Sequence, residues 1–145
     1  MITFNFSRRP SQGTPSGFDL GDIEISGDGS SVSSVGKLPD QGMMIFPSLS
    51  LLLDQVRQPV SSGRGTVEFC GVDSSFQVKF TVAKGVVTAV GEQGEIGRMS
   101  VPDFIGALLA AVSSFSEGEL SRLSEVDPVR DDLACAIADF RRLSR

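Results

Sequence analysis

The stretch that decides the fold is Gly65–Val90, GTVEFCGVDSSFQVKFTVAKGVVTAV. It divides into three β-rich segments, TVEFCGV, SFQVKFTV and GVVTAV, which are separated by turn-forming residues around Asp73 and at Gly85. Along the first two segments polar and apolar side chains alternate, which is the periodicity of a strand with one buried and one solvated face. The stretch therefore predicts an antiparallel meander, with a tight hairpin at Ala83-Lys84-Gly85.

Two half-buried strands are expected near the amino terminus. Residues 2–6 and 18–25 alternate apolar with polar side chains, so each segment can pack one face on a core. The polar positions of the second segment are predicted to face solvent: Asp19, Asp22 and Glu24. The sequence leaves open whether the two loop segments, residues 8–17 and 26–39, are ordered.

A third short strand, Met43–Phe46, is expected to precede a short helix. Four consecutive apolar residues are more typical of a core than of an exposed docking rim. Pro47 lacks an amide hydrogen and suits the first turn of a helix, where Ser48 is a candidate cap. Apolar residues then recur at helical spacing as far as Val56, and Pro59 is expected to end the helix.

Two longer helices are expected after the meander. A glycine-rich connector, residues 91–97, leads to a helix that starts at Ser100 or Val101 and carries an apolar stripe. A last helix is predicted to start at Asp127-Pro128, with acids near its start and arginines near its end, as the helix dipole favours. The whole pattern predicts one α+β domain over residues 1–145, a mostly antiparallel sheet covered by one short and two longer helices.

The composition argues against an enzyme. The 145 residues include no histidine, tyrosine or tryptophan. Histidine is the commonest general base and the commonest metal ligand, so its absence removes the usual catalytic and metal-binding options. Cys70 and Cys135 lie in apolar patterns and are expected to be reduced, buried thiols rather than a disulfide or metal ligands. No cofactor and no metal are expected.

The remaining catalytic patterns are weaker than their structural interpretations. Two carboxylates can hydrolyse a glycoside without histidine. The candidate pairs are Asp73 with Glu92 and Glu68 with Glu95, but all four are typical of turns or of a solvated sheet face. A Ser-Lys nucleophile would need one of only three lysines, and Asp73-Ser74-Ser75 is equally well explained as a capped turn. The glycine-rich stretches lack the spacings of phosphate-binding loops.

The charge predicts a protein partner. Eighteen acids against thirteen bases give a net charge of −5, which disfavours nucleic acid because binding there depends on lysine and arginine. No segment approaches the roughly 18 apolar residues of a membrane span. The amino terminus also lacks the order of a secretory signal, so a cytoplasmic protein without membrane contact is expected.

An acidic passage is the best candidate for the contact surface. Residues 117–132 contain six acids and two arginines, which would complement a basic partner and speed encounter. The structural alternative is a solvated helix junction whose acids favour the helix dipole. The candidate partner-binding residues are Glu117, Glu119, Glu125, Asp127, Asp131 and Asp132.

The layout of residues 51–115 carries a resemblance to a known family. It consists of LLLDQVRQ, then TVEFCGVDSSFQVKFTVAKGVVTAV, then a second amphipathic helix. In this layout the chain resembles small bacterial immunity proteins of polymorphic toxin systems. The resemblance implies a cytoplasmic antidote that binds and blocks its cognate toxin, and it assigns no site residues. The alternative is an acidic secretion chaperone or adaptor for an effector protein, and the oligomeric state is left open.

Overall fold

The predicted meander is present and is one strand longer than expected. The computed structural model describes residues 1–10 and 12–144. Four strands pair in sequence order: β5 (Gly65–Cys70), β6 (Gln77–Ala83), β7 (Val86–Gly91) and β8 (Gly94–Ser100). Lys84 and Gly85 have positive φ values of 52° and 77°, as a two-residue hairpin of this kind requires. We call these four strands the meander sheet.

The prediction of a connector at residues 91–97 is wrong, because Gly94–Ser100 is a strand. Its sequence GEIGRMS has little intrinsic β propensity. However, Ile96 and Met99 are buried in the core, and the Ile96 carbonyl accepts the Gly29 N–H at 2.9 Å. Tertiary contacts on both of its sides therefore stabilise a strand that local sequence does not indicate.

A second four-stranded sheet forms around a central strand. Its members are β1 (Ile2–Arg8), β2 (Leu20–Gly27), β3 (Ser31–Ser33) and β4 (Met43–Met44). All pairings are antiparallel: β2 pairs with β1 on one side and with β3 and β4 on the other. We call these strands the first sheet, and β1 is its edge. Residues 26–34, which read as a loop in the sequence, largely form the β2–β3 hairpin instead.

The helix α1 (Ile45–Ser62) is longer at both ends than predicted and is not a short helix. Ser48 does not cap it, because the Ser48 hydroxyl accepts the N–H of Val72 at 2.9 Å. Pro59 does not end it either. This proline is buried, and the helix continues to Gly63, whose N–H donates to the Pro59 carbonyl. Burial of the last turn compensates for the hydrogen bond that a proline inside a helix removes.

The predicted strand at Met43–Phe46 is reduced to two residues because α1 begins at Ile45. The prediction that this segment belongs to the core is confirmed, since Met43, Ile45 and Phe46 are fully buried. The two later helices, α2 (Val101–Glu119) and α3 (Pro128–Arg141), begin where predicted. Ser100 caps α2 by accepting the N–H of Asp103 at 3.2 Å.

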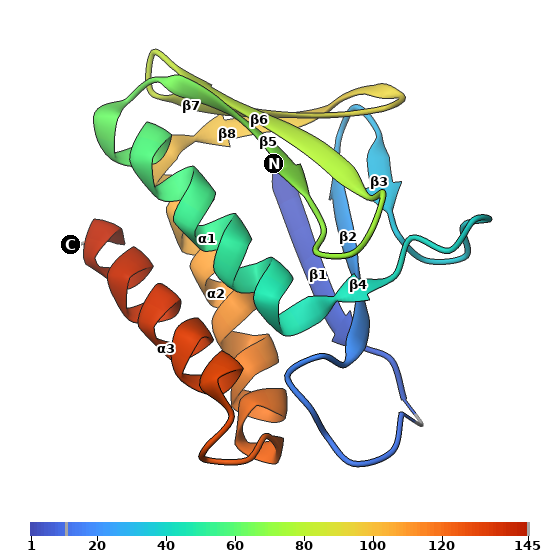
Figure 1. The fold of residues 1–145 in the computed structure, drawn as a ribbon. Coiled ribbons are helices and arrows are strands. Elements are labelled where there is room, and N and C mark those ends of the chain that lie inside the picture. Colours follow the sequence, from blue (N-terminus) through green and yellow to red (C-terminus); the bar gives the residue numbers. More distant parts are fainter. Residues whose placement is uncertain (11, 145) are drawn as a thin grey trace.

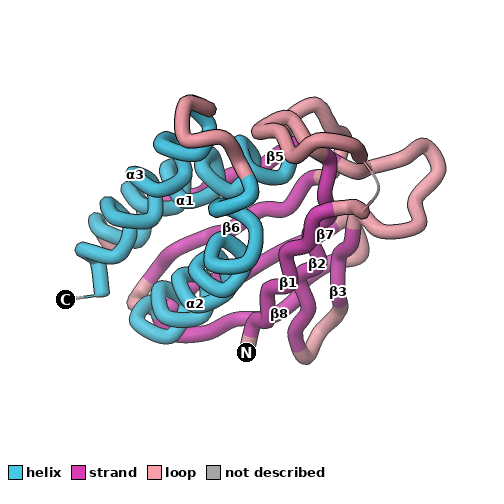
Figure 2. Tube along the Cα trace, turned by 90° about the horizontal axis from the view of Figure 1, so that it is seen from below, coloured by secondary structure: helices cyan, strands magenta, loops and turns pink. Residues whose placement is uncertain are grey.

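The three helices pack against the two sheets and, with them, enclose one buried apolar cluster (Figure 1). The α+β class with an antiparallel meander is therefore confirmed. Figure 2 shows the helices gathered on one side and the strands on the other. Short 3₁₀ turns, Leu120–Arg122 and Arg142–Ser144, follow α2 and α3. The largest fully buried side chains are Phe46, Phe69, Phe76, Phe80, Phe104 and Phe140.

The two cysteines are less buried than predicted. Both are free thiols, but Cys135 is exposed and Cys70 is only half-buried. Cys135 lies on α3, between the buried positions Leu133 and Ile137, so the helical periodicity turns it to the outer face. The expectation of a buried Cys135 is therefore wrong.

Candidate functional site

The six predicted contact acids lie where α2 leads into α3, and we call residues 117–132 the acidic junction (Figure 1). Four of them are exposed: Glu117, Glu125, Asp131 and Asp132. Within the described residues no ion pair or side-chain hydrogen bond engages these four carboxylates. Their charge is therefore available to another molecule.

The other two acids of the set are engaged within the chain. Asp127 caps α3 by accepting the N–H of Val129 at 3.0 Å, and its second oxygen accepts the N–H of Gly17, also at 3.0 Å. This residue therefore ties the segment before β2 to α3. Glu119 is half-buried, with one carboxylate oxygen 4.0 Å from Arg122. Asp127 therefore has a structural role, and Glu119 is less exposed than the other four acids.

A charge network at the end of the first sheet, buried at Asp19 and Asp22 and exposed at Asp40, was not anticipated from the sequence. Arg8 Nε donates to Asp19 at 2.8 Å, and these side chains are only 10% and 7% exposed. Arg9 bridges Asp22 at 3.0 Å and Asp40 at 2.8 Å. The prediction that Asp19 and Asp22 face solvent is therefore wrong, because the arginines at the end of β1 reach across to β2.

Arg9 lowers the pKa values of both carboxylates that it contacts, Asp22 and Asp40. Burial raises the pKa of Asp22, but hydrogen bonds from Arg9 and from the Ser34 hydroxyl outweigh burial and hold this pKa below its usual value. The hydrogen bond from Arg9, followed by that from the Gly42 N–H, holds the pKa of Asp40 well below its usual range. The same contacts, with Asp40 and then Asp22, raise the pKa of Arg9. The ion pairs of the network therefore hold the end of β1 against the start of β2.

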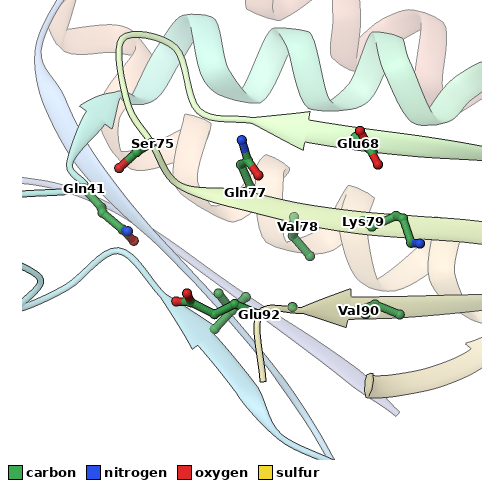
Figure 3. Close-up of a pocket in the computed structure, with 10 residues that line it drawn as sticks. Gln41, Glu68, Ser75, Gln77, Val78, Lys79, Val90 and Glu92 are labelled. Carbon is green, nitrogen blue, oxygen red and sulfur yellow. The ribbon is translucent and has the colours of Figure 1, made fainter. Parts of the chain in front are cut away.

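A groove of about 290 Å³ lies beside the meander sheet, between its strands and Gln41 (Figure 3). One member of each predicted acid pair lines it, Glu68 and Glu92. Asp73 instead occupies the β5–β6 turn, and Glu95 pairs with Arg98 at 2.7 Å. Neither predicted pair is therefore assembled in the groove.

Of the two serines in the predicted turn, Ser75 lines the groove and Ser74 is committed to the turn. The Ser74 hydroxyl donates to the Gln41 carbonyl at 2.7 Å and accepts the N–H of Phe76 at 3.0 Å. Asp73 has a positive φ of 59°, a conformation that aspartate tolerates better than most residues. The capped-turn interpretation of Asp73-Ser74-Ser75 accounts for these contacts.

A second groove, of about 400 Å³, runs between β1 and α2. The wall from β1 is Phe4–Arg8. The wall from α2 is formed by the small residues Ala111, Ser114 and Gly118, together with Phe115 and Glu119. Sequence reasoning missed this groove, although the spacing of Ala111, Ser114 and Gly118 on one side of a helix was a signal for it. We call it the β1 groove.

The described residues contain no cluster of three or more acid, cysteine or histidine side chains that could hold a metal. In the same part of the chain, no helix combines the length and the apolar character that crossing a membrane requires. Comparison with protein-family models, with curated proteins and with solved structures finds no match to this chain.

Proposed function

We propose that this chain is an immunity protein, a non-catalytic cytoplasmic protein that binds a toxin domain through a basic surface of that domain and blocks it. The observation that carries the proposal is the unequal use of acids in the molecule. Asp19, Asp22 and Asp40 are neutralised by arginines of the same chain. The acidic junction instead presents four carboxylates that have no partner in the described residues.

The helix dipole explains only part of the acidic junction. Asp131 and Asp132 lie in the first turns of α3, where negative charge is favourable. Glu117 lies in the last turn of α2, where the dipole disfavours it, and Glu125 lies outside both helices. Stability of the helices therefore gives no reason for Glu117 and Glu125. A basic partner does, because complementary charge accelerates encounter and disfavours wrong partners.

Charge reversal at the junction tests this function. The variant Glu117→Lys/Glu125→Lys is compared with Asp54→Lys/Glu92→Lys, which changes the net charge equally at exposed positions elsewhere. The partners to be tested are candidate toxin domains encoded by genes next to that of this chain. We expect the junction variant to associate about tenfold more slowly with the domain that the wild type binds and to protect toxin-expressing cells less well, while the control matches the wild type. Equal binding by both variants, or no protection by the wild type, contradicts the proposal.

The second candidate function is a secretion chaperone or adaptor that holds an extended segment of an effector. The β1 groove favours it, because one wall of the groove is a strand edge. A chaperone of this kind would be a homodimer that binds an unfolded amino-terminal segment, whereas an immunity protein would bind a folded domain. Light scattering of the purified complex gives its stoichiometry. Amide exchange of the bound partner then shows whether that partner is folded.

A further inference from the structure

The free edge of β1 presents a row of unpaired backbone groups. The N–H of Arg9 donates to the Leu20 carbonyl at 2.9 Å. Hydrogen-bonded and non-hydrogen-bonded residue pairs alternate along an antiparallel ladder. The backbone groups of the odd-numbered residues of β1 therefore bond to β2, and those of the even-numbered residues point away from it. The residues of β1 whose backbone N–H and C=O groups point away from β2 are Ile2, Phe4, Phe6 and Arg8. In the described part of the chain, no hydrogen bond outside the β1–β2 ladder reaches their backbone groups.

The other side of the first sheet confirms this alternation. Ser34 N–H donates to the Ile23 carbonyl, and Gly27 N–H donates to the Ser30 carbonyl, each at 3.0 Å. Odd-numbered residues of β2 therefore face β3, which leaves the even-numbered ones to bond β1. The register of β1 against β2 pairs these even residues with the odd residues of β1.

The β1 edge has few of the devices that usually protect a strand edge, because its one charged side chain, Arg8, is paired with Asp19. It is seven residues long and contains neither proline nor lysine. On the opposite side of β2 the strands are only three and two residues long. In the meander sheet, β8 is met by the N–H of Gly29, and β5 carries the exposed charge of Glu68. An open edge of this length is a template for a further strand.

The β1 groove provides room for such a strand. Figures 1 and 2 both show α2 beside β1. Ala111, Ser114 and Gly118 keep the helix wall low, and a Cβ built at Gly118 would meet nothing within 4 Å. A backbone edge on one side and a wall of mixed, mostly small side chains on the other leave space for a bound peptide to add a strand.

The charges at the groove select a basic occupant. At the Arg8 end the groove is lined by Glu119, whose buried Oε2 lies 4.0 Å from Arg122 but accepts no hydrogen bond within the described residues. Arg8 itself is already paired with Asp19. The exposed Glu117 immediately precedes Gly118 in α2, at the start of the acidic junction. A second copy of this chain would bring another net charge of −5 to the same place, so electrostatics disfavours it.

We propose that the β1 groove binds an extended segment of the protein partner as an additional strand of the first sheet, with a lysine or arginine of that segment beside Glu119. The inference rests on the proposed function for the basic character of the partner. The backbone groups of Phe4 and Phe6 supply the hydrogen bonds, and the small residues of α2 accept alternate side chains of the segment.

The experiment begins with amide exchange of the full chain. In the free protein we expect the outward amides of Phe4 and Phe6 to exchange faster than those of Asn5 and Ser7, which bond to β2. A displayed library of random peptides, each about ten residues long, is then selected against the same protein. The most enriched peptide is expected to alternate apolar and polar residues, to carry a basic residue near one end, and to slow exchange at Phe4 and Phe6 about tenfold.

Two variants of α2 provide the matched comparison. Gly118→Gln places a side chain in the groove, whereas Gly106→Gln adds the same side chain to α2 outside the residues that line it. Neither new Cβ meets an atom within 4 Å, so both variants should fold. We expect Gly118→Gln to weaken the selected peptide about tenfold and Gly106→Gln to leave it unchanged. Glu119→Gln should reduce the preference for basic peptides.

Several outcomes would overturn this site. They are no enrichment, equal binding by the Gly118→Gln variant, protection at the β5 edge instead of β1, and dimerisation of the chain through β1. The last result would make a second copy the occupant. The two proposals also separate. If the wild-type protein binds the selected peptide but does not protect cells from the toxin, the proposed function is contradicted and the strand site is not. If the Gly118→Gln variant still protects cells and binds the peptide as the wild type does, the strand site is contradicted and the proposed function is not.

Discussion

The two sheets of this protein reach similar sizes by different means. The meander sheet joins each strand to the next one in sequence, and its buried face is apolar: Val67, Phe69, Val78, Phe80 and Val87. The first sheet also buries an apolar face, but the ends of its two longest strands are fastened by Arg8 and Arg9 to carboxylates. Alternation of polar and apolar side chains is therefore sufficient for the meander sheet, whereas the first sheet also depends on the ion pairs of Arg8 and Arg9.

Breaking the buried ion pair of the first sheet should give the largest effect. Arg8→Ala leaves the Asp19 carboxylate buried without its partner, and removal of one member of a buried pair costs about 3 kcal/mol or more. We expect the free energy of unfolding, measured with urea, to fall by about that amount.

Lys79→Ala is the matched change in the meander sheet. Lys79 is exposed and has no ion pair among the described residues, so its removal should change the free energy of unfolding by no more than about 0.5 kcal/mol. Equal effects of the two substitutions would show that the first sheet does not depend on its charges more than the meander does.

The second effect is a loss of stability in acid that originates in the first sheet. The pKa values of Asp22 and Asp40 are lower in the folded protein than the value of about 3.9 that is usual for an aspartate. Their stabilisation is therefore complete above that value and is lost as the pH falls through the folded-state pKa values. We expect Arg9→Gln to flatten the fall of unfolding free energy below about pH 4.

Arg98→Gln serves as the counterpart in the meander sheet. Hydrogen bonding to Arg98 lowers the pKa of Glu95, but both groups are exposed, so solvent screens the pair. The acid profile of this variant should follow the wild type, as recorded by urea titrations at a series of pH values. A flattening as large as that of Arg9→Gln would contradict the assignment of acid sensitivity to the first sheet.

The smallest effect concerns a cross-strand pair of the meander. Glu68 and Lys79 are direct neighbours on β5 and β6, on the exposed face of the sheet. A double-mutant cycle with Ala at both positions should give a coupling of about 0.2–0.5 kcal/mol, reduced by salt. A larger coupling would mean that charge also contributes substantially to the meander.

Strands and helices with strong local patterns were predictable. Alternation along TVEFCGV and SFQVKFTV predicted β5 and β6, and capping residues at Ser100 and Asp127 predicted the starts of α2 and α3. The errors fall where packing overrides local preference. Pro59 is tolerated inside α1 because its turn is buried, and β8 forms from a glycine-rich segment because both of its sides find partners.

The candidate site was predictable in part. The acids of residues 117–132 are visible in the sequence, and the positions of Glu117 and Glu125 relative to the helices follow from the predicted helix ends. The commitment of Asp127 to Gly17, which lies 110 positions away, could not be anticipated. The β1 groove was also out of reach, because it depends on which strand becomes the edge of the first sheet.

Local sequence patterns are sufficient to predict the α+β class, the meander, the capped starts of two helices and the concentration of acids after α2. These features depend on residues that are close together in the chain, where periodicity and capping act directly. Long-range packing, in contrast, fixes which carboxylates are neutralised and which strand edge is open. Those properties depend on residues brought together from distant positions, as Arg9 is with Asp40, and no local pattern records such pairings.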